Sequence, residues 1–226
     1  MASATISKDV IQFLKELKAN NNREWFADNK KRFREVEAMA KGFYASIKDE
    51  LNTHDEIEKL KMFRIYRDVR FSKDKTPYQP HFAGSFARAG AQRRGGYYLR
   101  IRPSESFIAV GFWQPNPKDL LRIRKEFETD ASRVREIISE NNFSKVWGDL
   151  QGDEVKTAPK GFNKEDPNID LIRKKAFVFV RNFTDAEVVA GDFLNVVDDS
   201  YKAIRPFFDY MSEVLTTNLN GESLLD

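Results

Sequence analysis

The chain has 226 residues, of which 41% are hydrophobic and 32% are charged, and its formal net charge is +3. It has no cysteine and two histidines, which excludes disulfides, thiol nucleophiles, cysteine zinc sites and three-histidine metal sites. No segment approaches the roughly 18 apolar residues of a membrane span, and the N-terminus lacks the apolar stretch of a secretory signal. We expect a globular, cytoplasmic protein with no membrane partner and no metal.

The first quarter of the sequence is predicted to be helical. Ser7 can cap a short amphipathic helix, which the asparagines at 20–22 end. Asn21 and Glu24 have the spacing of a capping box, so a second helix is expected to begin there. Its apolar stripe runs over 26–51 and predicts one continuous helix of about seven turns.

From Met62 onward, apolar residues alternate or cluster in short runs rich in Phe, Tyr, Ile and Val, which is typical of strands. Five strands are predicted, at 62–67, 82–88, 97–102, 107–113 and 176–183. The residues at 102–105 favour a type I turn with proline at its second position. Because such short connections cannot join parallel strands, the neighbouring strands should be antiparallel.

Helices are predicted again between and after these strands. Asn116 followed by Pro117 predicts a helix start, and a second helix is expected from Thr129 to 138. Thr184 begins a capping box. A last apolar stripe runs over 193–215, and a kink is expected at its proline, residue 206. Segment 148–168 has few apolar residues and is either a surface excursion or a lid over a site.

These elements predict an α+β fold, with N-terminal helices, a central antiparallel sheet and C-terminal helices packed on it. We expect one domain over 1–226. It would be helical over 1–60, sheet-rich over 61–183 with inserted helices at 117–140, and helical again over 184–226.

The small net charge hides a strong polarity along the chain. The segment from Lys61 to Arg102 holds eleven basic and two acidic residues, a charge of +9, while the remaining chain carries −6. Residues 183–226 alone hold nine acids against two basic residues. Clustered arginines suit phosphate or carboxylate recognition, because a guanidinium binds such groups bidentately. The same pattern also arises if a basic sheet packs against an acidic C-terminal helix.

The densest feature is the segment 64–78, which reads R-x-x-R-D-x-R-F-x-x-x-K-x-P-Y. If 62–70 is extended, side chains alternate between two faces, and Arg67 lies among apolar neighbours. A buried arginine needs a partner, and Asp68 or a distant carboxylate is expected. In this interpretation the arginine-rich motif is a structural Arg/Asp network.

In a functional interpretation the motif binds an anion. The ligand-binding candidates are Arg64, Arg67, Arg70, Lys75 and, from a neighbouring strand, Arg100. Because arginine stays protonated, any proton would move through Asp68, Lys75, Tyr78 or His81. Tyr78 and His81 flank a proline and could face one cavity. For His81, a satisfied structural histidine is the alternative.

The motif resembles the signature of a family of bacterial proteins of about this length, a domain of unknown function. The resemblance extends over nearly the whole chain, including the sequence Asn-Arg-Glu-Trp-Phe at 22–26, Gly-Gly-Tyr-Tyr at 95–98 and Gly-Phe-Trp at 111–113. It implies an α+β, bacterial, intracellular protein with no established activity. It assigns no catalytic residue.

Three hypotheses follow. The preferred one is a protein that binds a small anionic or phosphorylated ligand, with catalysis left open. A nucleic-acid-binding module using Tyr97, Tyr98, Arg100 and Arg102 is less favoured, because the acidic C-terminus would repel a polyanion. The third is an interaction protein in which the motif is structural. No motif indicates a cofactor, and no feature sets an oligomeric state.

Overall fold

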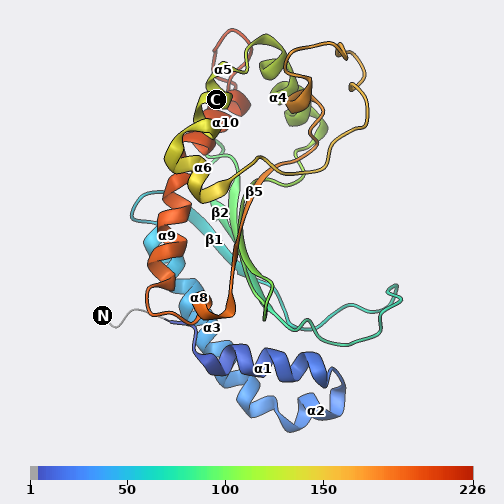
Figure 1. Cartoon of the computed structure of the whole chain (residues 1–226), viewed down its shortest axis with the longest axis vertical. Coiled ribbons are helices and arrows are strands. Elements are labelled where there is room, and N and C mark those ends of the chain that lie inside the picture. Colours follow the sequence, from blue (N-terminus) through green and yellow to red (C-terminus); the bar gives the residue numbers. More distant parts are fainter. Residues whose placement is uncertain (1–4, 226) are drawn as a thin grey trace. The chain divides into compact units, whose positions relative to one another are not determined.

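A computed structural model describes residues 5–225, so the first four residues of the segment tested for a secretory signal lie outside it. The fold is α+β, as predicted (Figure 1). The helices are α1 (Lys8–Ala19), α2 (Arg23–Asp28), α3 (Lys30–Leu51), α4 (Pro117–Thr129), α5 (Ser132–Ser139), α6 (Asn141–Trp147), α7 (Ile169–Ile172), α8 (Asp185–Val188), α9 (Phe193–Ala203) and α10 (Arg205–Thr216). The strands are β1 (Ile57–Met62), β2 (Phe82–Arg88), β3 (Gly96–Ile101), β4 (Ser106–Phe112) and β5 (Phe177–Phe183).

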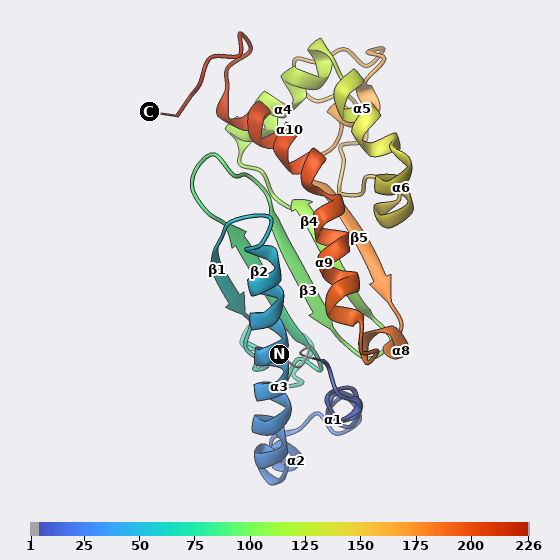
Figure 2. The ribbon, with the colours of Figure 1, turned by 90° about the vertical axis from the view of Figure 1, so that its left-hand side faces the viewer.

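The strands form an antiparallel sheet in the order β1-β2-β3-β4-β5 (Figure 2). The chain divides into two compact units, and the boundaries between them fall within β2 to β5 and within α9. The first unit holds the described residues up to Phe86, with Tyr98–Ile108 and Asn182–Asp199. The second holds Ala87–Tyr97, Ala109–Arg181 and the described residues from Ser200. No helix within 5–225 has both the length and the apolar character needed to cross a bilayer.

The N-terminal helices differ from prediction in two details. Asn22, rather than Asn21, caps α2, because its side chain accepts a hydrogen bond from the Trp25 backbone N–H at 2.9 Å. The long helix is also split at Asn29, so the expectation of one continuous helix is wrong. The Asn29 side chain donates to the Trp25 carbonyl at 2.9 Å. The Asn29 N–H donates to the same carbonyl at 3.0 Å, so the break lies in the backbone of Asn29, whose φ and ψ are −99° and 11°.

Helix α3 lies along the strands of the first unit (Figure 2), and Tyr44 fixes it there. Its hydroxyl lies 3.2 Å from the Phe82 carbonyl oxygen and 3.1 Å from that of Leu99. Its ring stacks on Phe86 with 6.1 Å between centroids. Gly84 leaves space for this ring, since a Cβ at that position would lie 2.8 Å from Tyr44 Cε1.

The first strand lies earlier than predicted. β1 ends at Met62, and residues 63–81 form a loop instead of a strand at 62–67. Only Ile57 is buried in β1. This edge strand therefore lacks the apolar alternation from which a strand is recognised. The 63–81 loop extends away from the strands in Figure 1 and contains a single isolated bridge, between Tyr66 and Tyr78.

The other strands lie within one residue of their predicted positions. The turn between β3 and β4 is confirmed, because the Glu105 N–H donates to the Arg102 carbonyl at 2.9 Å. Ser104 has a φ of 63°, which is typical of a type II turn and not of the expected type I.

The later helices follow their capping residues. The Asn116 side chain accepts from the Asp119 N–H at 2.9 Å with Pro117 next in the chain, and Thr184 forms the predicted capping box. The next helix begins at Ser132 and not at Thr129, because its N–H is held by Asp130. The helix is interrupted at Ile204, between α9 and α10, and Pro206 lies in the first turn of α10.

Part of segment 148–168 is tied to the chain that leads into β5. The Gln151 N–H donates to the Val178 carbonyl at 2.8 Å, and the Val155 N–H donates to the Arg173 carbonyl at 3.0 Å. These contacts lie within the second unit.

Candidate functional site

The 63–81 loop belongs to the first unit, and its two arms are joined by backbone hydrogen bonds. The Arg67 N–H donates to the Pro77 carbonyl at 2.9 Å, and the Gln79 N–H donates to the Ile65 carbonyl at 2.7 Å. The arms therefore run side by side, and the residues between them form a closed tip.

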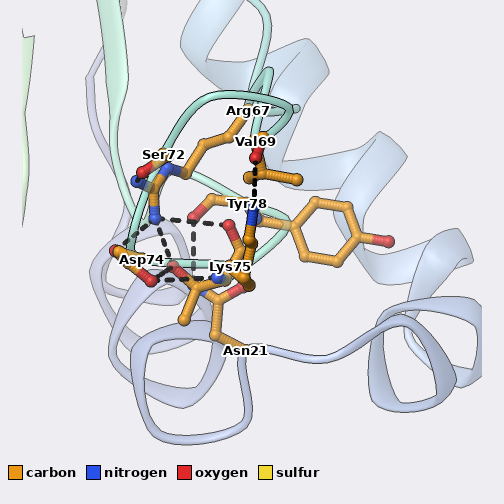
Figure 3. Close-up of polar contacts among 8 residues, drawn as sticks. Asn21, Arg67, Val69, Ser72, Asp74, Lys75 and Tyr78 are labelled. Atoms are coloured by element: carbon orange, nitrogen blue, oxygen red, sulfur yellow. Dashed lines mark hydrogen bonds and ion pairs between the residues drawn. The ribbon is translucent and has the colours of Figure 1, made fainter.

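Arg67 holds this tip together (Figure 3). Its guanidinium contacts the Asp74 carboxylate, the Thr76 hydroxyl and the Thr76 carbonyl, the last at 3.2 Å, and it reaches Ser72 Oγ at 3.4 Å. The Thr76 N–H, followed by Arg67, lowers the pKa of Asp74 to about 2. Of the two expected partners, Asp68 or a distant carboxylate, Asp68 is excluded, because loop closure brings Asp74 to Arg67. Arg67 is engaged within the loop, as the structural interpretation required.

Asp68 and Arg70 form a pair of their own on the loop surface. Their closest atoms, Arg70 Nη2 and Asp68 Oδ2, are 2.6 Å apart, and both side chains are exposed. This contact lowers the pKa of Asp68 and raises that of Arg70. Lys75 Nζ donates to the Val69 carbonyl at 3.0 Å. Arg70 and Lys75 therefore stabilise the tip and are not among the residues that line the cleft described below.

Tyr78 docks the loop on the N-terminal helices. The side-chain amide of Asn21 binds its backbone on both sides, and its ring stacks on Phe26 with centroids 4.0 Å apart. Burial, followed by the charge of Tyr66, raises the pKa of Tyr78. In Figure 3 the Tyr78 ring points away from the Arg67 cluster. Asn21 was interpreted as part of a helix end and as the start of a capping box, and neither pattern indicates a contact with Tyr78.

A cleft of about 460 Å³ lies between the loop and the sheet residues of the first unit. It is lined by Phe63, Arg64, Tyr66, Arg67, Asp68, Ser72, Gln79, His81, Ala83 and Tyr98. Of the predicted site residues, the structure brings four to this cleft: Arg64, Arg67, Asp68 and His81. Tyr78 is not among them, so the expectation that it shares a cavity with His81 is wrong.

Gln79 lines the cleft but was not predicted. It shares one side of the returning arm with His81 and Ala83, at alternating positions of the chain. Alternation is the signal that could have identified it, since every second residue of an extended segment faces the same way.

Arg64 is the cation of this cleft that has no interaction partner within the described residues. Within residues 5–225 it makes no hydrogen bond, ion pair or ring contact. Its neighbours differ: Arg67 and Arg70 are paired as described, and Arg100 donates to the Glu105 carbonyl at 3.1 Å. The positive charge of Arg64 is therefore available to a ligand.

His81 contributes a neutral imidazole. Its Nδ1 is buried and has no hydrogen-bond partner within the described part of the chain. Burial, followed by the charges of Arg100 and Arg102, lowers the pKa of His81 to about 4. The ring is thus uncharged at neutral pH. Its unpartnered nitrogen does not fit the alternative of a fully satisfied structural histidine.

The sheet tyrosines and arginines do not form the continuous surface expected for a nucleic acid. Tyr97 is buried, and so cannot stack on a base. Arg100 lies 4.3 Å from the Phe107 ring centroid, and Arg102 Nη1 is 3.4 Å from the Glu105 carboxylate. Only Tyr98 of this group reaches the cleft.

In the second unit, some of the basic residues face acidic side chains. Arg94 pairs with Asp119, and Arg88 Nη2 lies 3.8 Å from Asp209 of α10. Packing of basic strand residues against the acidic C-terminal helix, one of the two explanations for the charge pattern, is confirmed at Arg88. No group of three potential metal ligands occurs among the residues that the structure describes.

Residues 9–210 match the family described as conserved hypothetical protein (DUF2461). The chain belongs to this family. The resemblance to a family of unknown function is thereby confirmed. A comparison with curated proteins gives no match. The DUF2461 region includes Asn21, the 63–81 loop and every residue that lines the cleft. Because the family description assigns no reaction, the function has to be inferred from the cleft.

Proposed function

We propose that the protein binds a small anionic or phosphorylated ligand in this cleft, with Arg64 as the anion-binding side chain. One observation carries the proposal: Arg64 lines a concave site and, within residues 5–225, has no partner of its own. A guanidinium can form two parallel hydrogen bonds with a carboxylate or a phosphate. An uncompensated guanidinium in a cleft therefore favours such a ligand.

The other lining residues suggest the rest of the ligand. The side-chain amide of Gln79 and the imidazole of His81 can hydrogen-bond to polar groups. Phe63 and Tyr98, whose ring centroids are 6.3 Å apart, form an apolar wall. Ligand sites commonly combine such a wall with a few polar anchors. We therefore expect an anion with a flat apolar portion to bind more tightly than inorganic phosphate.

The test is a calorimetric titration of the full chain with inorganic phosphate and with phenyl phosphate. Wild-type protein should bind both, phenyl phosphate more tightly. Arg64→Ala should lose at least tenfold in affinity, because the charged hydrogen bonds disappear. Arg34→Ala is the matched control, since Arg34 is an exposed arginine of α3 that does not line the cleft. Equal binding by Arg64→Ala and wild type would refute the proposal.

A further inference from the structure

The tip of the 63–81 loop, residues 69–75, presents an aromatic ring to solvent. Phe71 is 96% exposed, the largest exposure among the large hydrophobic residues in the described part of the chain. The other exposed aromatic residues of the loop, Phe63 and Tyr66, line the cleft, so Phe71 is the one exposed ring of residues 69–75. An aromatic ring that is exposed to this extent can stack on a flat partner.

The backbone on either side of Phe71 is held in place. The Ser72 N–H and Lys75 Nζ both donate to the Val69 carbonyl, at 3.3 and 3.0 Å. Arg67 also reaches Ser72 Oγ. A side chain presented on an ordered turn loses less conformational entropy on binding than one on a flexible segment.

The charge of the tip is positive. Its arginine and its aspartate are already engaged, Arg70 with Asp68 and Asp74 with Arg67. Lys73 has no ion-pair partner within residues 5–225, and Lys75 contacts only an uncharged carbonyl. Two lysines, both on the C-terminal side of Phe71, are thus left without a compensating carboxylate within residues 5–225. This arrangement is complementary to a polyanion.

We propose that the tip docks single-stranded nucleic acid, with Phe71 stacked on a base and Lys73 and Lys75 against the adjoining phosphates. Single-strand binders combine aromatic rings with cations in this way. A bilayer or a protein partner would be better served by several adjacent apolar side chains, whereas this tip alternates one exposed ring with charges. Phe71, Lys73 and Lys75 do not line the cleft that holds Arg64, so the inference goes beyond the proposed function.

The experiment measures fluorescence anisotropy of a short labelled single-stranded oligonucleotide, as RNA and as DNA, with the full chain. Binding is expected for the single strand and not for the matching duplex, whose bases are stacked internally. If two phosphates are neutralised, a fourfold rise in salt should weaken binding about sevenfold.

Phe71→Ala should weaken binding about tenfold and leave the salt dependence unchanged. Because Phe71 is almost fully exposed, this variant should fold normally. Lys73→Gln with Lys75→Gln should flatten the salt dependence. Trp113→Ala is the matched control, since Trp113 is an exposed aromatic residue in the second unit, and it should bind like wild type.

Absence of single-strand binding at low salt, or wild-type binding by Phe71→Ala, would overturn the inference. Anionic lipid vesicles are titrated in parallel. Phe71-dependent binding to vesicles but not to oligonucleotides would assign the tip to a membrane surface, which also overturns it. Loss of phenyl phosphate binding in Arg64→Ala tests the cleft separately.

Discussion

The side-chain amide of Asn21 binds both backbone groups of Tyr78: Nδ2 donates to the Tyr78 carbonyl at 2.9 Å, and Oδ1 accepts from the Tyr78 N–H at 3.1 Å. These residues are 57 positions apart. The contact fixes the returning arm of the 63–81 loop to the N-terminal helices, and thereby sets the position from which Gln79 and His81 enter the cleft.

Asn21→Ala should therefore destabilise the protein by about 2 kcal/mol, because a partly buried donor and acceptor both lose their partner. Urea unfolding followed by circular dichroism measures this difference. Asn142→Ala, at an exposed position in α6, is the control and should change stability by less than about 0.5 kcal/mol. An Asn21→Ala variant as stable as wild type would show that the loop is held elsewhere.

Replacement by alanine should lower the stability of the protein at Arg67 and leave it nearly unchanged at Arg64. Arg67→Ala should cost about 2 kcal/mol, since charge-assisted hydrogen bonds to Asp74 and Thr76 are lost. Arg64→Ala should stay within about 0.5 kcal/mol of wild type, because Arg64 has no partner within residues 5–225. Denaturant unfolding of both variants provides the comparison.

Arg67→Lys tests the geometry of this network. It should recover little of the lost stability, because an ammonium cannot reproduce the planar fork that reaches several acceptors. Full recovery would mean that charge alone matters. Increased proteolytic cleavage within 67–77 in Arg67→Ala, and not in Arg64→Ala, would locate the effect in the tip.

His81 should make stability depend on pH in mildly acidic solution. Its pKa in the folded protein is about 4, below the ordinary value near 6.5, so the unfolded chain takes up the proton first. Stability is therefore complete above pH 6.5 and falls as the pH decreases toward 4. Between pH 7.5 and pH 5 the loss from this group should be about 2 kcal/mol.

His81→Gln should remove this contribution, which urea unfolding at the two pH values can measure. The expected result is a smaller difference between pH 7.5 and pH 5 in the variant than in wild type. The same pH dependence in both proteins would show that His81 remains accessible to protons in the folded state.

Gly111→Ala should be severely destabilising, by about 3 kcal/mol or more. Gly111 has a φ of 125°, and a Cβ there would overlap the Phe177 carbonyl oxygen in the second unit. Gly42→Ala is the contrasting variant, because its Cβ would enter open space in the middle of α3 and should stabilise by up to about 1 kcal/mol. Thermal unfolding of both distinguishes a steric requirement from general sensitivity to glycine replacement.

Local signals account for the parts of the fold that were predicted correctly. Asn116 and Thr184 cap helices through residues three positions away, so the sequence alone contains the interaction. The strand β1 contains almost no such signal, because only Ile57 is buried. In the 63–81 loop, apolar and polar residues alternate as they do in a strand, although no strand forms there. Helices and strands can thus be predicted from sequence where the capping or burial pattern is local. The prediction fails at the exposed edge strand β1.

The candidate site depends on contacts that sequence spacing does not specify. The arginine-rich motif did point to the loop that borders the cleft. The positions of the carboxylates in the folded chain decide which arginine is left without a partner. Asp74 reaches Arg67 only because the loop closes. Asn21, in the connection between α1 and α2, hydrogen-bonds to the Tyr78 backbone. Such pairings require the positions of distant segments.

The backbone hydrogen bonds that join Arg67 to Pro77 and Gln79 to Ile65 have a further consequence for the architecture of the chain. They bring the two ends of the tip together at its base, so the tip leaves and re-enters the protein at one place. Removing residues 67–77 would delete Arg67, Asp74 and Thr76 together and leave no partner unsatisfied among them. Residues 67–77 are thus a module that can be exchanged for another sequence, while the cleft residues outside it, among them Arg64, Gln79 and His81, are retained.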